Sequence, residues 1–504
     1  MSATANLQAL EPRNIRALVA GSLLPGFAGS RLPDWVAGEL KSGLAGVCLF
    51  GSNIESGTQL QELTSAIRRA NPAAVIAIDE EGGDVTRLHY NTGSPHPGNA
   101  VLGRLDDPGM TFASAAAIGN ELRRAGCTLD LAPSVDINSN PGNPVIGVRS
   151  FGDNAPLAAS HAAAWVQGLQ STGVAACAKH FPGHGDTAQD SHLMLPTVEA
   201  TPGVLAEREL EPFKAAIAAG TASIMTSHIL VPALDPDNPA TFSTAILQGL
   251  LREQLGFTGV IVTDALDMKG ASGGIGIPAA AVRALAAGCD LLCLGSDTGE
   301  AQFNAVITAV AEALRSGELP LRRVEEARTR SAGLLNLLPR DIRPAEELSG
   351  HPSGLPVNPA RAAAAFRLNT RARKWLRSSA HPFELHQLSS TANQAVGSVP
   401  WGPASLEPDW NPAIAVRIVD PGHRLPAHRA GTRIALVGRN LHLHRQSMEL
   451  ISNLRRQDVD LIVVEMGWPS ADPGIADACT FGASRLVSTA LMQLLTGRLP
   501  QGVE

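Results

Sequence analysis

The sequence has little of what marks membrane, nucleic-acid-binding or disulfide-stapled proteins. It contains one tyrosine among 504 residues, and only 17% of its residues are charged. Lys and Arg are dispersed and the net charge is -7, which excludes a basic stripe for nucleic acid and a polybasic membrane patch. No run of apolar residues approaches the roughly 18 that a transmembrane helix needs, so none is expected.

Cysteine is also scarce. The six cysteines lie mostly within apolar runs such as AGVCLFG and VAACAKH, which predicts small buried hydrophobic side chains and no disulfide framework. Cys289 and Cys293 are four residues apart, but the DLL between them is typical of a buried strand and argues against a zinc site. A reducing compartment fits this usage.

One N-terminal stretch imitates a signal peptide. The run ALVAGSLLPGFAGS follows Arg13 and Arg16, but Glu11 precedes it and no basic cluster stands at the extreme start. The apolar run is also short, so we interpret it as a first buried strand and expect a cytoplasmic protein.

Short apolar runs alternate with helix-period segments over about the first 340 residues. The eight runs are RALVA, GVCLF, AVIAI, TLDLA, VAACA, ASIM, GVIV and LLCL. Near-continuous apolar strands indicate burial on both faces, as in a parallel sheet. Eight such units in this length favour a (β/α)₈ TIM-type barrel over residues 1–340 rather than an open doubly wound sheet.

A second, smaller α/β sandwich domain is predicted after the barrel. Residues 341–360 form a proline-rich polar linker, and residues 361–504 contain the strand-like runs FELHQL, AIAVRIV, RIALVG and DLIVVEM. In this block LHLHR places His442 and His444 in strand-like alternation, and we interpret both as surface or core residues rather than ligands.

Polar residues gather after the predicted strands. In a barrel, reactive groups collect on the loops at the C-terminal strand ends. The third, fourth, fifth, sixth and seventh runs lead into IDEEGGDVTR, APSVDINSNP, KHFPGHGDTAQDSH, MTSH and VTDALDM, whereas the opposite strand ends are bland. These loops are therefore expected to form one site.

The loop KHFPGHGDTAQDSH allows a metal cage, a solvated turn or a proton-transfer device. His180 and His184 have the spacing of a helical metal pair, but Pro182, Gly183 and Gly185 disfavour a helix there. In the solvated-turn alternative, the histidines only satisfy backbone groups.

The end of the loop favours proton transfer. Asp190 stands two residues before His192, and a carboxylate in that position can orient an imidazole and support its protonated form. Histidine then gives and accepts a proton near neutral pH. Asp264 follows the seventh run, where it either caps the next helix or serves as a carboxylate nucleophile.

These motifs resemble those of glycoside hydrolase family 3 β-N-acetylglucosaminidases, in the NagZ-like branch. Besides KHFPGHGDTAQDSH, the segments IDEEGGDVTRL, LAPSVDINSNPGNPVIGVRSFG, MTSHILVPALD, PATFS and GVIVTDALDM fall in family order and cover most of residues 10–340. ACTFGASRLVSTALMQLLTG is similar to the second domain of two-domain members, with less specific motifs.

The resemblance implies a retaining double displacement. Asp264 would form a glycosyl-enzyme intermediate, and His192, held by Asp190, would protonate the leaving oxygen and then deprotonate water. A His–Asp dyad would replace one of the two carboxylates that ordinary retaining enzymes hold about 5–5.5 Å apart. The residues matching sugar-contacting family positions are Asp79, Arg87, Arg149, Lys179 and His180. No metal or organic cofactor is implied.

The chain departs from the family pattern at two positions. Many members have DQEGG followed by arginine, whereas this chain has Glu80 and Asp84. Asp79 and Arg87 are retained, so we expect the subsite for N-acetylglucosamine (GlcNAc) to survive.

Three functions fit to different degrees. The first is an exo-β-N-acetylglucosaminidase that releases terminal GlcNAc from a small glycan such as a peptidoglycan fragment. The second is a phosphorylase, with inorganic phosphate as acceptor, because a histidine base would not repel a phosphate dianion as a carboxylate would. A non-catalytic sugar-binding protein is disfavoured because Asp264 and His192 are both present. The β-glucosidase branch lacks the KHFPGHG…DSH loop.

Overall fold

The protein is described by a computed structural model. The described residues are 11–191, 194–338, 355–377, 382–390, 395–406, 414, 416–422 and 428–499. His192 and most of the predicted linker lie outside these ranges. Among the described helices, none is both long enough and apolar enough to cross a membrane.

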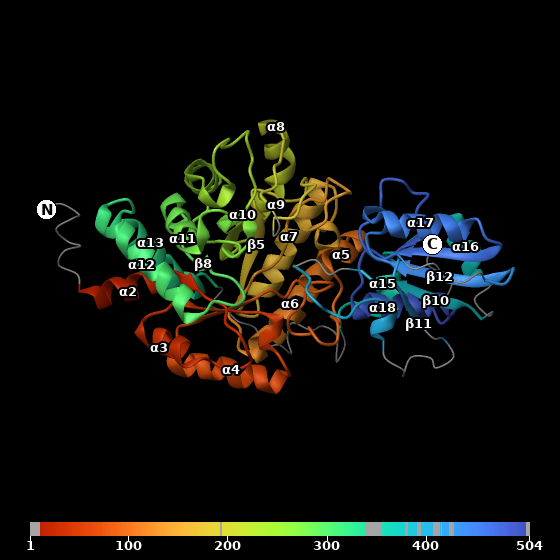
Figure 1. Cartoon of the computed structure of the whole chain (residues 1–504), viewed down its shortest axis with the longest axis horizontal. Coiled ribbons are helices and arrows are strands. Elements are labelled where there is room, and N and C mark those ends of the chain that lie inside the picture. The colour runs from red at the N-terminus through yellow and green to blue at the C-terminus, as the bar shows by residue number, and fades with distance from the viewer. Residues whose placement is uncertain are drawn as a thin grey trace.

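The first part of the chain is built on a curled parallel sheet (Figure 1). Six strands pair in sequence order: β2 (Gly46–Leu49), β3 (Val75–Ile78), β4 (Leu129–Asp130), β5 (Ala175–Phe181), β6 (Ser223–Thr226) and β7 (Val260–Val262). A parallel pair of β1 (Leu23–Leu24) and β8 (Leu292–Cys293) lies beside them.

Helices follow the strands and cover the outer face of this sheet. The longer ones are α4 (Gly57–Ala70), α6 (Pro108–Ala125), α7 (Ala155–Gln170), α11 (Gly276–Ala287), α12 (Glu300–Ser316) and α13 (Leu321–Gly333). Their start signals are local: Asp107 accepts a hydrogen bond from Met110 N at the start of α6, and Gly126 ends that helix with φ +89°.

The strands are buried on both faces, as their near-continuous apolar sequences predict. Val47 and Ile76 pack into the large core beneath the helices. Cys48, Cys177 and Cys293 belong to a separate small cluster on the opposite faces of the strands. All six cysteines are free and buried, so the expectation of buried hydrophobic cysteines is confirmed.

The predicted first strand is wrong. RALVA belongs to helix α2 (Pro12–Ala20), and the strand is the later pair Leu23–Leu24. Pro12 starts the helix, and Ile15, Leu18 and Val19 place three buried side chains at helical spacing. The other seven predicted runs coincide with β2 to β8.

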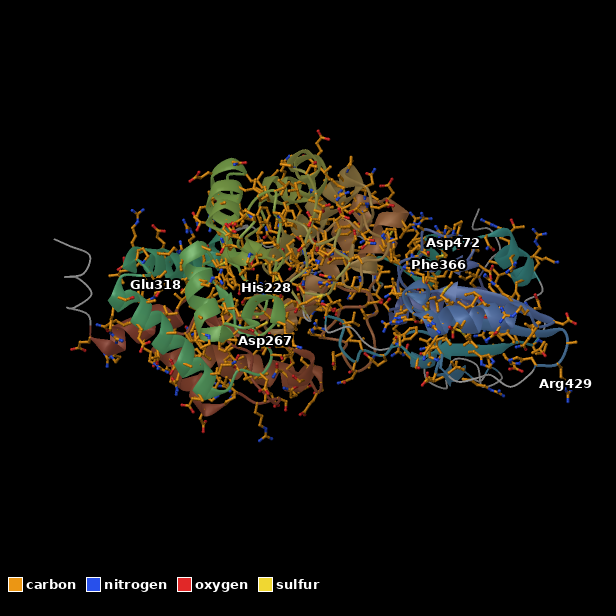
Figure 2. All side chains as sticks on the ribbon, turned by 45° about the horizontal axis from the view of Figure 1, so that its top comes forward. His228, Asp267, Glu318, Phe366, Arg429 and Asp472 are labelled. Atoms are coloured by element: carbon orange, nitrogen blue, oxygen red, sulfur yellow. The ribbon has the colours of Figure 1, made fainter. Side chains whose placement is uncertain are left out.

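The remaining strands form a second sheet, drawn in cyan and blue in Figure 1. Its order is β11 (Val416–Val419), β10 (Glu384–Leu388), β12 (Thr432–Gly438), β13 (Val459–Glu465), β14 (Ala478–Cys479) and β9 (Arg367–Leu368), and only β9 is antiparallel to its neighbour. Helices α17 (Arg445–Arg455) and α18 (Arg485–Leu495) belong to this part. In Figure 2, Phe366 and Asp472 mark it, and His228 and Asp267 mark the first part.

The two parts are in direct contact. Ala100 on α5 (Asn99–Leu105) packs in one apolar cluster with Cys479 and Phe481, and Arg104 stacks on the Phe481 ring. The LHLHR segment also differs from its strand-like interpretation, because residues 441–443 form a 3₁₀ turn before α17.

Candidate active site

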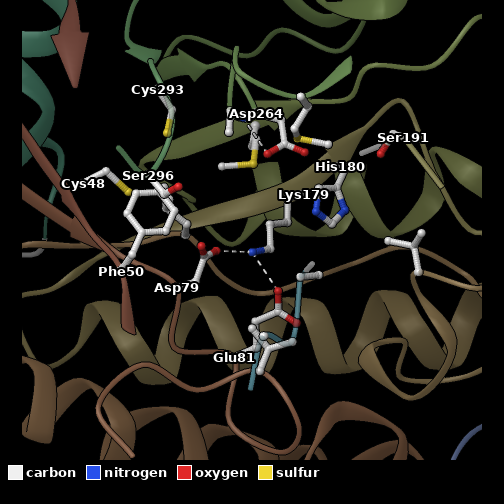
Figure 3. A pocket seen from close by; sticks show the side chains of 18 of the residues that line it. Cys48, Phe50, Asp79, Glu81, Lys179, His180, Ser191, Asp264, Cys293 and Ser296 are labelled. Atoms are coloured by element: carbon white, nitrogen blue, oxygen red, sulfur yellow. Dashed lines mark hydrogen bonds and ion pairs between the residues drawn. The ribbon is translucent and has the colours of Figure 1, made fainter. Parts of the chain in front are cut away.

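A cavity of about 610 Å³ opens where the carboxyl ends of the parallel strands meet (Figure 3). Six of the eight predicted site residues line it: Asp79, Arg87, Arg149, Lys179, His180 and Asp264. Asp190 lines a neighbouring pocket instead, and His192 lies outside the described residues.

Four charged side chains on the cavity wall form one network. The Lys179 ammonium lies 2.7 Å from Asp79 Oδ1 and 2.7 Å from Glu81 Oε1 (Figure 3). Arg149 donates to both oxygens of Glu81, at 2.9 and 2.7 Å. Burial raises the pKa of Glu81, but Arg149 and Lys179 outweigh it and hold that pKa well below its usual range. Glu81 therefore stays ionised between the two cations.

His180 is held by a residue that the sequence analysis did not single out. Its Nδ1 lies 2.6 Å from Asp136 Oδ2, and its Nε2 lies 3.3 Å from Arg149 Nη2. Burial raises the pKa of Asp136, but His180 lowers it to about 2, so this carboxylate stays ionised and orients the ring. Its place in SVDIN, after the fourth run, was the available signal.

His184 has a different role from His180. Its Nε2 lies 3.0 Å from Ser191 Oγ and its Nδ1 lies 3.0 Å from Thr187 Oγ1. The imidazole therefore makes hydrogen bonds within the loop after β5 and stabilises its conformation. Burial and the nearby His180 lower the pKa of His184 to about 4, which keeps it neutral. Two groups of His and Glu in the described chain could hold a metal ion, and neither includes these histidines.

Asp264 stands at the end of β7, half-buried on the cavity wall. Its Oδ1 accepts a hydrogen bond from Ala265 N at 2.7 Å. His228 fixes the same turn, because its Nε2 lies 3.0 Å from Ala265 O. The next helix, α10 (Lys269–Ser272), has Met268 as its N-cap, so Asp264 does not cap it.

The two departures from the family pattern lie off the cavity. Buried Glu80 accepts hydrogen bonds from Thr86 Oγ1, Arg87 N and Leu88 N through one oxygen, and so shapes the loop after β3. Asp84 faces the second part of the chain, where it pairs with Arg439 at 3.5 Å. Neither acid is therefore placed to contact a ligand in the cavity.

The second part of the chain completes the cavity wall. Arg87 Nη2 donates to Ala395 O at 2.7 Å and Arg87 Nη1 donates to Val396 O at 3.3 Å. Ala395, Gly397 and Ser398 also line the cavity. Because Arg87 is bound here by backbone carbonyl oxygens, no sequence motif indicates this part of the wall.

A buried carboxyl group, that of Glu209, is connected to the loop after β5 through Arg208. Arg208 donates to Asp186 Oδ2 at 2.5 Å and to Glu209 Oε1 at 2.6 Å. Burial raises the pKa of Glu209 and Arg208 lowers it; the effect of burial is larger, so the pKa is raised to about 7. The unfolded chain loses this proton near pH 4.5 and the folded chain keeps it to about pH 7. Because the unfolded state binds fewer protons in that window, stability falls as pH rises through it.

Replacing Glu209 with Gln should remove that pH dependence. Relative to Glu209→Gln, the wild-type free energy of unfolding should fall by about 2–3 kcal/mol between pH 4.5 and pH 7 and stay level above it. Urea unfolding curves at a series of pH values measure this. Glu207→Gln, at an exposed neighbour, should follow the wild-type curve. Parallel curves for wild type and Glu209→Gln would show that Glu209 does not hold its proton in the folded state.

Comparisons with known proteins identify the family. Residues 34–334 match the glycosyl hydrolase family 3 N-terminal domain. A β-hexosaminidase A from Pseudoalteromonas piscicida is 35% identical over 62% of this chain, a match that spans 56% of that protein. A β-hexosaminidase from Nitrosomonas eutropha is 35% identical over 61% of this chain and 89% of its own length.

Among solved structures, a family 3 β-N-acetylglucosaminidase from a Paenibacillus strain matches 98% of both chains, with a TM-score of 0.84 and 29% identity. The charged cavity at the carboxyl edge of a curled parallel sheet places the chain among α/β proteins with sites at strand ends. The chain belongs to glycosyl hydrolase family 3, and the resemblance to its β-N-acetylglucosaminidases is confirmed.

Proposed function

We propose that the protein is a retaining exo-β-N-acetylglucosaminidase that releases terminal GlcNAc. One observation carries the proposal: Asp264 lines the same cavity as the charged side chains of Asp79 and Lys179 (Figure 3), and Arg149 lines it too. Sugar hydroxyls need such donors and acceptors, and a ligand lacking a hydroxyl would leave one of them unpaired. The relatives' hexosaminidase names agree with this substrate class.

In the proposed mechanism, Asp264 attacks the anomeric carbon and the leaving oxygen departs. The C–O bond of the glycoside breaks as the Asp264 carboxylate forms a glycosyl ester, and His192 gives the leaving oxygen its proton. His192, oriented by Asp190, then takes a proton from water, which attacks the same carbon and releases Asp264. Two inversions leave the configuration unchanged.

The sugar-binding roles follow from the network. Asp79 and Arg149 would accept from and donate to ring hydroxyls, while Lys179 holds Asp79 in place at 2.7 Å. Arg87 and His180 complete the binding set, since both line the cavity and both are anchored by neighbours. Such anchoring suits catalysis because the binding groups need no rearrangement when substrate arrives.

We also infer that the eight strands close into a full (β/α)₈ barrel. Two sets of hydrogen bonds support closure: Cys48 N donates to Pro25 O beside β1, and Leu291 N donates to Ile261 O beside β7. The division into a barrel at 1–340, a linker at 341–360 and a second domain at 361–504 remains part of this proposal. So do the cytoplasmic location and peptidoglycan fragments as the source of the glycan.

Phosphorolysis is the alternative, and one assay separates the two reactions. The protein is incubated with 4-nitrophenyl β-N-acetylglucosaminide with phosphate, or with sodium chloride at equal ionic strength, and the sugar product is identified. We expect free GlcNAc at the same rate in both, with the β anomer formed first. N-acetylglucosamine 1-phosphate at a phosphate-dependent rate would make the enzyme a phosphorylase, and no turnover would contradict the proposed activity.

A further inference from the structure

Two histidines and a glutamate in the first part of the chain meet outside the cavity. His89 and His96 lie on the long loop after β3, and Glu121 lies on α6. His89 Nε2 lies 2.9 Å from Glu121 Oε2, and His96 Nε2 lies 3.0 Å from Glu121 Oε1. We call these three residues the loop cluster. None of them lines the cavity, so the proposed glycosidase mechanism leaves them without a role.

The backbone holds His96 with one ring nitrogen directed at Glu121. Pro95 and Pro97 flank it and restrict the conformation of this segment. The residue is 1% exposed, and it packs closely on the loop, since a Cβ added to Gly82 would lie 3.4 Å from His96 Cβ. Its Nδ1 has no hydrogen-bond partner in the described chain, so Nε2 is the ring nitrogen that meets a polar group.

The two imidazole rings converge on the same carboxylate. Their centroids lie 6.1 Å apart with an interplanar angle of 61°, and the ligand atoms of the loop cluster all lie within 4.8 Å of one another. Two atoms bound to one tetrahedral ion at roughly 2.0–2.1 Å lie about 3.3 Å apart. The nitrogen-to-oxygen distances of 2.9 and 3.0 Å are close to that spacing. Small side-chain rotations would therefore bring all three groups onto one ion.

The ligand types favour zinc. Zinc binds two imidazole nitrogens and one carboxylate oxygen in known sites, with water in the fourth position. Mg²⁺ and Ca²⁺ prefer oxygen ligands throughout, so the two imidazoles disfavour them. The side chains of His89 and Glu121 are 26% and 27% exposed, which gives an ion and its water a path from solvent. The carboxylates of Glu80 and Glu121 both place negative charge beside His89, and this also favours a cation.

A second cluster of the same composition lies in the second part of the chain and consists of Glu384, His386 and His428. There both imidazoles face one carboxylate oxygen, Glu384 Oε2, at 3.0 Å from His386 Nε2 and 3.6 Å from His428 Nδ1. Arg417 adds positive charge near His386, which opposes the binding of a cation. The second cluster is therefore the weaker candidate, and it provides a control for the loop cluster.

The position of the loop cluster connects it to the contact between the two parts of the chain. Arg87, on the same loop as His89, hydrogen-bonds to the backbone of the second part. Tyr90 follows His89 directly, and its hydroxyl oxygen accepts a hydrogen bond from Ser398 N at 3.0 Å. An ion bound to the loop cluster would join this loop to α6. It would thereby restrict the segment that contacts the second part.

We propose that His89, His96 and Glu121 form a structural zinc site that fixes the loop after β3 against α6. Each imidazole binds the ion through Nε2 in its neutral form, so a proton carried by Nε2 is released to solvent when zinc binds. Glu121 supplies one carboxylate oxygen, and water completes the tetrahedron. This inference does not depend on the proposed glycosidase activity.

Calorimetric titration of the full-length protein with zinc, after dialysis against EDTA, tests the site. We expect the loop cluster to bind one ion with a Kd below about 1 μM near neutral pH. Glu121→Gln and His89→Gln should each raise that Kd by about 100-fold or more, because each removes a ligand. Both side chains are partly exposed, so both variants should fold, which circular dichroism checks. The control His428→Ala should change the Kd by less than about twofold.

Two further measurements address the identity of the ion and its effect on the loop. Mg²⁺ in large excess should not compete with zinc, because it binds imidazole poorly. Zinc should slow hydrogen–deuterium exchange of backbone amides in residues 86–98 of the wild type, and it should leave their exchange unchanged in Glu121→Gln.

Each outcome decides the proposal. Loss of one zinc ion in both loop-cluster variants, with its retention in His428→Ala, supports the site, even if a second ion binds at the second cluster. Absence of zinc binding to the wild type would make the loop cluster a set of ion pairs only and overturn the proposal. An unchanged Kd in both variants, loss of binding in His428→Ala alone, or displacement of zinc by Mg²⁺ would overturn it as well. Zinc binding without slower exchange in residues 86–98 would overturn the structural role.

Discussion

Replacing Asp264 with Gly should lower kcat on 4-nitrophenyl β-N-acetylglucosaminide by roughly 10⁴-fold or more, because it removes the carboxylate that we propose forms the glycosyl ester. Added azide should restore part of the activity, since a small anion fits the space that the carboxylate leaves on the cavity wall. Azide attacking from that side inverts the anomeric carbon, so the product should be the α-glycosyl azide. Rates with and without azide, and product analysis by NMR, measure both effects.

Asp267→Gly is the matched control for this experiment. Asp267 lies three residues further along the same loop, lines the same cavity and accepts a hydrogen bond from Ser296 N. Its loss should alter binding but should give no azide product of inverted configuration. Asp264 would lose its assignment as nucleophile if Asp264→Gly kept more than about a tenth of the activity, or if Asp267→Gly alone formed the α-azide.

Replacing Glu81 with Ala should destabilise the protein by about 3–5 kcal/mol, the usual cost of removing one partner from a buried ion pair. Glu81 is 3% exposed and accepts from both Arg149 and Lys179, so its removal leaves two cations with one carboxylate, Asp79. Activity should fall as well, because Arg149 and Lys179 both lose their anchor. Urea unfolding curves and kcat/KM measure the two effects.

Glu326→Ala provides the surface comparison for Glu81. Glu326 is a half-buried helix residue that pairs with Arg322 at 2.8 Å and with Arg323 at 3.3 Å, each within one turn, so its loss should change the free energy of unfolding by less than about 1 kcal/mol. If Glu81→Ala does not fold, Glu81→Gln keeps the side-chain volume and should still lose about 1–3 kcal/mol. A loss below about 1 kcal/mol in both Glu81 variants would contradict the network as a source of stability.

The sequence predicted the strands well where both neighbours of a run were loops or helices with clear ends. AVIAI and GVIV became β3 and β7 because their residues are apolar on both faces. RALVA is helical, although a short apolar run fits a strand or a buried helix turn equally, and Pro12 is the start signal that favours the helix.

The cavity residues could be predicted from the sequence where a motif supplies their side chains, but not where main-chain atoms form the cavity wall. Lys179, Arg149 and Asp79 stood in recognisable loops, and the structure brings them together. Asp136 was overlooked because its partner His180 lies 44 residues away, a pairing that only the fold reveals. The neighbouring pocket that Asp190 lines had no sequence signal, because its walls join segments that are hundreds of residues apart.

The hydrogen bonds from Arg87 to Ala395 O and Val396 O have a consequence for how this site is inherited. A backbone carbonyl oxygen is present whatever the side chain. This part of the cavity can therefore be retained even if the residues at both positions are substituted. Alignments of distant relatives would then look unrelated over this loop even where the ligand meets the same wall. In a hybrid enzyme whose second sheet comes from a relative, the backbone conformation of this loop, rather than its residue types, would decide whether the two hydrogen bonds to Arg87 form.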